Sequence, residues 1–109
     1  MPNVEELISA TRSPSDADKA LIRKAYAFAE KAHAPQKRFS GEPYFNHCFA
    51  VALKLAELHM DPRMIAAGLL HYTMEDAGVT SAELEKEFGK EILFLVEGVT
   101  KLGKLKYRG

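Results

Sequence analysis

Apolar residues recur along this chain at spacings of three and four, which is the period of an amphipathic α-helix, and strand-like alternation is almost absent. The clearest stripe lies within residues 15–34, and its members are Leu21, Ile22, Ala25, Phe28, Ala29 and Ala32. The pattern therefore predicts an all-α fold, a compact bundle of about five to six helices.

Helix start and stop signals divide this pattern. Side chains that can cap a helix N-terminus precede four of the apolar runs, at Asn3, Ser15, Asp61 and Thr80. Pro35 and Gly89 are residues at which helices end. The predicted helices are a short one after Asn3 and then residues 15–34, 44–59, 61–76, 80–89 and 92–102, with a polar loop over residues 36–43. In the 44–59 helix we expect Val51, Leu55 and Leu58 to face the core.

Composition narrows the class of protein. The 109 residues suffice for one domain with a single modest core. Fifteen acidic and fifteen basic side chains cancel, so nucleic-acid binding is disfavoured. The one cysteine, Cys48, cannot form an internal disulfide, which fits a reducing compartment. Because no signal peptide and no apolar run of about 20 residues is present, we expect a cytoplasmic protein without a membrane segment.

Three segments carry the candidate chemistry. They read Ser40-Gly41-Glu42-Pro43-Tyr44-Phe45-Asn46-His47, Leu69-Leu70-His71-Tyr72-Thr73-Met74-Glu75-Asp76 and Val96-Glu97-Gly98-Val99-Thr100-Lys101-Leu102. Together, in this order, they resemble the HD-type hydrolase domain of the RelA/SpoT family, which removes pyrophosphate from guanosine tetraphosphate. The resemblance extends over roughly Ala20 to Leu105 and implies an HD-domain-like helical fold.

The resemblance implies roles for four residues of this chain. His47 and His71 would be ligands of a metal ion, Mn²⁺ in the case of an active enzyme. Glu75 and Asp76 would position or deprotonate the attacking water, and His71 and Glu75 are four apart, on one helix face. The family's third ligand is an aspartate directly after the second histidine, where this chain has Tyr72. The fourth ligand, also an aspartate, would lie beyond residue 109, so we expect residues 1–109 to form a single truncated HD-type domain.

Tyr72 weakens the expected metal site. A phenol has an ordinary pKa near 10, so at neutral pH tyrosine offers a metal ion no charge. The site then retains two neutral imidazoles and no carboxylate ligand, and we expect no tightly bound cofactor. Cys48, next to His47, is either a small buried residue or a soft ligand suited to zinc. His33 and His59 have no motif partners and are expected at the surface.

The loop before the first histidine is the candidate nucleotide-binding segment. In the resembled family it stacks on and hydrogen-bonds the guanine base, which implies nucleotide contacts for Lys37, Arg38 and Ser40. An arginine can also stack on a base or bind phosphate. Phe39 stands where a lysine is typical, so one cation is lost and an aromatic side chain gained. The alternative is a solvated turn whose basic residues have no ligand.

The departures from the family pattern lead to a functional hypothesis. They cluster in the motifs that should line one cleft, and most replace polar or small residues by aromatic or apolar ones. Such residues anchor protein interfaces. The hypothesis is a catalytically impaired HD-hydrolase scaffold, degenerate or engineered, whose former active-site mouth binds a protein partner through Phe39, Phe45, Phe49, Tyr72 and Met74.

The alternative hypothesis is an active enzyme. It would be a metal-dependent guanosine-nucleotide 3′-pyrophosphohydrolase with an altered ligand set. His47, His71 and Asp76 would hold the ion, and Glu75 would orient the water. A metal in such a site lowers the pKa of its bound water and neutralises charge on the phosphate.

Overall fold

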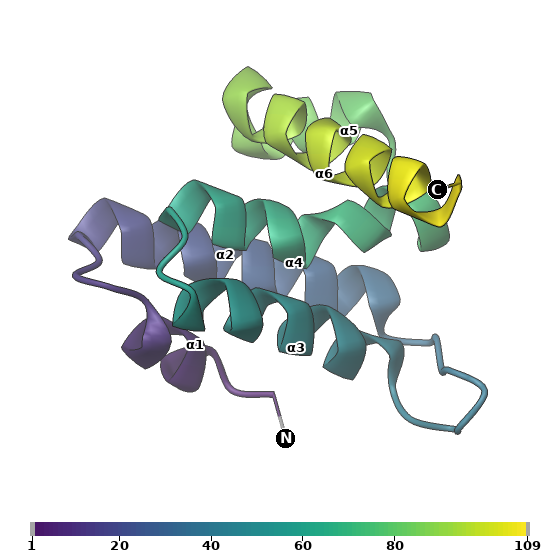
Figure 1. Ribbon diagram of the computed structural model, residues 1–109, viewed down its shortest axis with the longest axis horizontal. Helices are drawn as coiled ribbons and strands as arrows, with labels where there is room; N and C mark the ends of the chain where they lie inside the picture. The colour runs from purple at the N-terminus through teal and green to yellow at the C-terminus, as the bar shows by residue number, and fades with distance from the viewer. Residues whose placement is uncertain (1, 109) are drawn as a thin grey trace.

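The chain folds into α-helices joined by short connections, as the computed structural model shows (Figure 1). The structure describes the backbone of residues 2–108 and the side chains of residues 2–101. Over that range the helices are α1 (Val4–Ala10), α2 (Asp16–His33), α3 (Tyr44–Glu57), α4 (Pro62–Asp76), α5 (Ser81–Phe88) and α6 (Lys90–Arg108). The predicted all-α fold is confirmed.

The predicted capping residues begin these helices. The side chains of Asn3 and Asp61 each accept a hydrogen bond from the backbone N–H two residues on, at 2.8 Å. Ser15 before α2 and Thr80 before α5 each form a reciprocal capping box with the acidic residue three positions later. Such caps satisfy backbone N–H groups that have no partner within the helix. Gly89 separates α5 from α6 with φ of +88°, a conformation that costs glycine little.

Helix α4 lies at the centre of the molecule. It packs against α2, α3 and α6, and α5 lies against α6 (Figure 1). Eight residues of α4 are buried: Ile65, Ala66, Ala67, Gly68, Leu69, Leu70, His71 and Thr73. A helix surrounded on all sides must be apolar around most of its circumference. The second half of α4, which carries the HD-like motif, is therefore held by neighbours on several faces.

The inward face of α3 differs from the prediction. Its buried residues are Phe45, Cys48, Phe49, Ala52 and Ala56. Of the three residues predicted to face the core, Leu55 is partly buried and packs against the core, Val51 is half-buried, and Leu58 is wrong, because it is 64% exposed. Ala52 and Leu55 face α4 at a point where the two helices approach closely. A Cβ atom on Gly68 of α4 would lie 2.6 Å from the Cδ1 atom of Leu55 and 3.9 Å from the Cα atom of Ala52. Because residue 68 has no side chain, the side chain of Leu55 can pack against the backbone of α4 at this point.

Two further expectations are corrected. His33 was expected at the surface but is only 1% exposed, because it lies in the last turn of α2 beneath Tyr44. His59 is exposed as predicted. Helix α6 begins at Lys90, two residues earlier than predicted, and continues to Arg108. No helix in the described part of the chain is long and apolar enough to span a membrane.

Candidate functional site

Three segments meet at one end of the helical bundle. They are the loop of residues 36–43 (the 36–43 loop), the first turns of α3 and the last turns of α4. An isolated bridge between Lys37 and Pro43 closes the loop. His47 of the first motif and Tyr72 and Asp76 of the second are thereby brought to one end of the bundle, although the two motifs are far apart in sequence.

His47 contacts Tyr72 directly. Its Nε2 atom is hydrogen bonded to the Tyr72 hydroxyl at 3.1 Å, and the two ring centroids are 5.1 Å apart. Partial burial lowers the pKa of His47 below its ordinary value, and the nearby Arg38 cation lowers it further, opposed by Glu42. The Tyr72 phenol is therefore the hydrogen-bond partner of one ring nitrogen of His47.

His71 has the orientation usual for a metal-binding histidine. Its Nδ1 atom lies 2.8 Å from the backbone oxygen of Gly68. Since a carbonyl only accepts, Nδ1 carries the proton, and in the neutral ring Nε2 keeps its lone pair. Burial lowers the pKa of His71, with the Gly68 hydrogen bond and the Glu75 carboxylate opposing it. The neutral ring is thus favoured.

Asp76 is engaged by groups from the loop and from α3. The Tyr44 hydroxyl donates to its Oδ2 atom, and the Gln36 side-chain amide donates to its backbone oxygen. Burial, and then the hydrogen bond to Asp76, raise the pKa of Tyr44 well above its ordinary value. Glu75, its neighbour on α4, is exposed. The carboxylate proposed to act on water is therefore tied to a tyrosine.

The 36–43 loop is a closed turn with exposed side chains. The Arg38 N–H donates to the Glu42 oxygen at 2.9 Å, and the Gly41 N–H donates to the Arg38 oxygen at 2.8 Å. Gly41 adopts φ of +86°, which favours glycine. The side chains of Lys37, Arg38 and Ser40 are exposed, so they are accessible to a ligand.

The predicted aromatic protein-binding surface is only partly a surface. Phe39 is fully exposed at the tip of the loop, and Tyr72 and Met74 are half-buried. Phe45 and Phe49, at 5% and 7% exposure, belong to the core and pack edge-on against Tyr26 of α2, with centroids 4.9 and 6.2 Å away. The prediction that Phe45 and Phe49 bind a protein partner is wrong, because this part of α3 faces the core.

The donor set does not fit the predicted metal site. Among residues 2–101 no group of three His, Cys, Asp or Glu side chains is placed to hold an ion. The Tyr72 phenol is hydrogen bonded to His47, and the Tyr44 hydroxyl donates to Asp76. Cys48 is completely buried, and burial raises the pKa of its thiol to about 12. Its complete burial agrees with the first of the two alternatives, a small buried residue.

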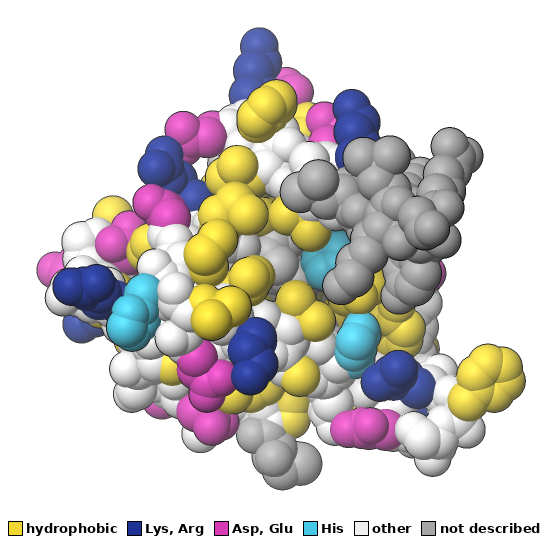
Figure 2. Space-filling view, viewed as in Figure 1, with side chains coloured by type: hydrophobic (Ala, Val, Ile, Leu, Met, Phe, Trp, Pro, Cys, Tyr) yellow, Lys and Arg dark blue, Asp and Glu magenta, His cyan; other side chains and the backbone are white. Residues whose placement is uncertain are grey.

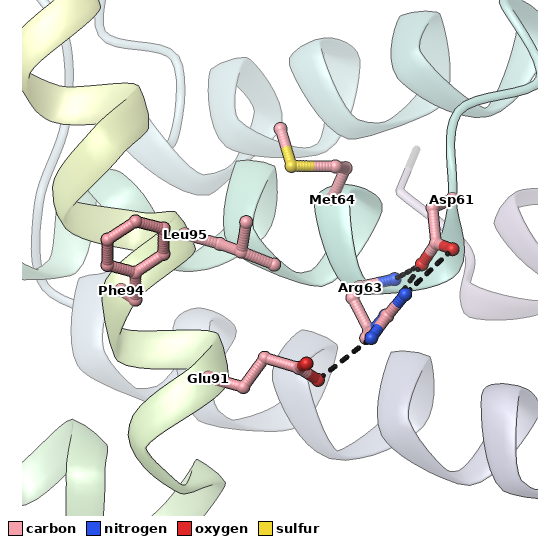
Figure 3. Close-up of a pocket in the computed structure, with 6 residues that line it drawn as sticks. All are labelled: Asp61, Arg63, Met64, Glu91, Phe94 and Leu95. Carbon is pink, nitrogen blue, oxygen red and sulfur yellow. Dashed lines mark hydrogen bonds and ion pairs between the residues drawn. The ribbon is translucent and has the colours of Figure 1, made fainter.

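Hydrophobic side chains also gather outside these motifs. On the face formed by α3, α4 and α6 they form a band beside the histidines (Figure 2). A pocket of about 320 Å³ is lined by Asp61, Arg63, Met64, Glu91, Phe94 and Leu95 (Figure 3). Arg63 joins the start of α4 to α6, with its guanidinium 3.1 Å from Asp61 and 3.0 Å from Glu91. This pocket contains none of the predicted site residues.

Comparison with known proteins gives the family. The profile described as "HD domain" matches residues 25–108, which is most of the sequence. The chain belongs to the HD-domain family. Its resemblance to the RelA/SpoT type is confirmed by relatives in the collection of curated proteins.

Three of these relatives show how much of the chain is matched. The chain of this HD domain is 49% identical over 106 residues to a guanosine-3′,5′-bis(diphosphate) 3′-pyrophosphohydrolase of Aquifex aeolicus, covering 97% of the chain and 15% of the relative. It is 49% identical over 98 residues to the bifunctional (p)ppGpp synthase/hydrolase SpoT of Escherichia coli, covering 90% and 14%. It is 49% identical over 94 residues to a GTP pyrophosphokinase rsh of Brucella ovis, covering 86% and 12%. The chain thus spans only a small part of each relative.

Proposed function

We propose that this HD domain binds a guanosine nucleotide through the 36–43 loop and does not hydrolyse it. The observation that carries the proposal is the 3.1 Å hydrogen bond between His47 Nε2 and the Tyr72 hydroxyl. It occupies the nitrogen that a metal ion would need, with a group that is neutral at ordinary pH. The domain is therefore a catalytically impaired hydrolase scaffold.

The exposed loop supports the binding part of this proposal. Lys37 and Arg38 are two cations on a turn whose backbone is closed by its own hydrogen bonds. Arginine recognises phosphate through its planar fork of N–H donors and can stack on a base. The relatives named above act, by their names, on guanosine nucleotides, and the chain is 49% identical to them. A loop of this kind can retain affinity after the metal site is lost.

Calorimetric titration of Mn²⁺ into the metal-stripped protein tests the hydrolytic part. We expect no detectable binding to the native chain or to Tyr72→Phe, which frees His47 but adds no charge. In Tyr72→Asp, which supplies a carboxylate, affinity should rise by more than about tenfold. Tight one-to-one binding to the native chain, with hydrolysis of guanosine tetraphosphate, would instead establish the alternative enzyme in which His47, His71 and Asp76 hold the ion.

Titration of guanosine tetraphosphate without metal tests the binding part. We expect the native chain to bind the nucleotide and the double variant Lys37→Ala, Arg38→Ala to give no binding signal. Lys54→Ala is the matched control, because Lys54 is an exposed cation of α3, with a side chain 72% exposed and only a surface ion pair. Equal affinities for both variants would show that the loop cations have no role.

Protein binding remains a second candidate function, because the ring of Phe39 is fully exposed at the loop tip. An exposed aromatic side chain is the usual anchor of an interface. A purified partner that binds the native chain should lose affinity for Phe39→Ala and keep it for Leu58→Ala. Leu58 is likewise an exposed apolar side chain, at 64%, on another part of the surface. Equal losses would mean that the contact is not specific to the loop.

A further inference from the structure

Gln36 is the residue through which the 36–43 loop contacts the end of α4. All four of its hydrogen-bonding groups are used. Its backbone N–H donates to the His33 oxygen at 2.9 Å, and its backbone oxygen accepts from the Tyr44 N–H at 3.0 Å. Its side-chain Oε1 atom is hydrogen bonded to His33 Nδ1, and its Nε2 atom donates to the Asp76 oxygen.

The partners of Gln36 also contact each other. The His33 ring stacks on Tyr44 with centroids 4.9 Å apart and planes inclined by 26°, and the Tyr44 hydroxyl donates to Asp76. His33, Gln36, Asp76 and Tyr44 therefore form a closed circuit of contacts, which we call the loop latch. The latch joins α2, the loop, α3 and α4, elements that are distant in sequence.

His33 gives the latch its rigid base. Only 1% of its surface is exposed, so its ring is fixed by packing. Since Oε1 of Gln36 can only accept, Nδ1 of His33 carries the proton. The Gln36 amide is thereby oriented, with its N–H groups turned to the Asp76 oxygen. An amide held at both ends loses little further freedom when the loop takes a ligand.

We propose that Gln36 is a positioning residue, which holds the 36–43 loop against α4 in the conformation that presents Lys37 and Arg38. The consequence for affinity rests on the proposed nucleotide binding, whereas the positioning of the loop does not. A loop that is already ordered loses less conformational entropy when it binds. Gln36 itself need not touch the ligand, because its polar groups are committed within the protein.

Loop order can be measured without any ligand. The chain contains no tryptophan, so Phe39→Trp at the exposed loop tip gives a single fluorescent reporter. In that background Gln36→Met keeps the side-chain length and removes both side-chain hydrogen bonds. Gln36→Glu keeps an acceptor for His33 and removes the donor to Asp76. We expect the indole anisotropy to fall in both variants, more in Gln36→Met.

Thr80→Ala is the matched control for a general loss of stability. It removes the cap of α5, away from the loop, and should lower the melting temperature without changing the anisotropy. Unchanged anisotropy in Gln36→Met, or an equal fall in Thr80→Ala, would overturn the loop latch.

Nucleotide affinity is measured separately, with Phe39 intact. Loss of one or two net hydrogen bonds from the bound conformation should raise the Kd for guanosine tetraphosphate about threefold to tenfold in Gln36→Met. A fall in anisotropy with unchanged Kd would overturn the role of Gln36 in binding and leave nucleotide binding itself intact. If the native chain binds no nucleotide, the proposed function fails, while the anisotropy still decides whether the latch exists.

Discussion

Phe45→Ala and Phe39→Ala remove the same ring from opposite environments. Phe45 is 5% exposed and packs edge-on against Tyr26, with ring centroids 4.9 Å apart, whereas Phe39 is fully exposed. Both lie in or beside the motif that resembles an active-site mouth. Replacement by alanine should therefore lower the free energy of unfolding strongly at Phe45, in the core, and little at Phe39, at the surface.

The expected cost follows from burial. A buried phenylalanine removes about 150–250 Å² of apolar surface from water, worth about 4–6 kcal/mol at roughly 25 cal/mol per Å². Measured phenylalanine-to-alanine changes in cores cost about 3–5 kcal/mol, a value that combines the lost transfer free energy with the cost of the remaining cavity. For a domain of this size that corresponds to a loss of at least about 12 °C in Tm. Phe39→Ala should stay within about 0.5 kcal/mol of the native chain.

Thermal unfolding followed by circular dichroism at 222 nm measures both variants. Since a domain of this size has a total stability of about 5–15 kcal/mol, Phe45→Ala can fail to fold. Phe45→Leu, which keeps most of the volume, then gives a smaller loss that still exceeds that of Phe39→Ala. If Phe45→Ala and Phe39→Ala lower Tm equally, the assignment of Phe45 to the core is wrong.

Three further outcomes can be checked by denaturation. The pKa values of His47 and His71 lie below the ordinary 6.5, so as pH falls through 6.5 the unfolded chain takes up protons that the folded chain does not. The denaturant concentration at the unfolding midpoint should therefore decrease when the pH is lowered from about 7.5 to about 5.5. The decrease should be smaller when both histidines are replaced by glutamine. Thr80→Ala should cost about 1 kcal/mol through loss of the α5 cap, and a change below about 0.3 kcal/mol would contradict that role. Arg63→Ala should lower Tm at low salt and less at high salt, because exposed ion pairs are screened; equal losses would exclude the charges as the cause.

Local signals predicted the helix boundaries well. Capping at Asn3, Ser15, Asp61 and Thr80 depends on residues within three positions of each other, so the sequence alone contains the whole interaction. The end of α5 at Gly89 is local in the same sense, because only the backbone conformation of one residue is involved.

The motifs predicted which residues lie near one another at this end of the bundle, but not the contacts they make, and their roles stay a prediction. The motif order brought His47, His71, Glu75 and Asp76 into one hypothesis, and the structure places them where the loop, α3 and α4 meet. Sequence reasoning missed His33 and Gln36, which carry no motif of their own. The available signal was a polar glutamine directly after the helix-ending Pro35, and it did not indicate a partner.

Residue identity and spacing by themselves determined the fold class, the starts of the four capped helices and the family of this protein. Only the tertiary structure decided which side of α3 faces the core, that His33 is buried, and that the Tyr72 hydroxyl lies against His47. The helical period is compatible with more than one inward face of α3. The face that is buried depends on how closely a neighbouring helix approaches, as α4 does where Gly68 lies against Leu55. Contacts between residues more than 20 positions apart depend on that packing, and no local pattern contains it.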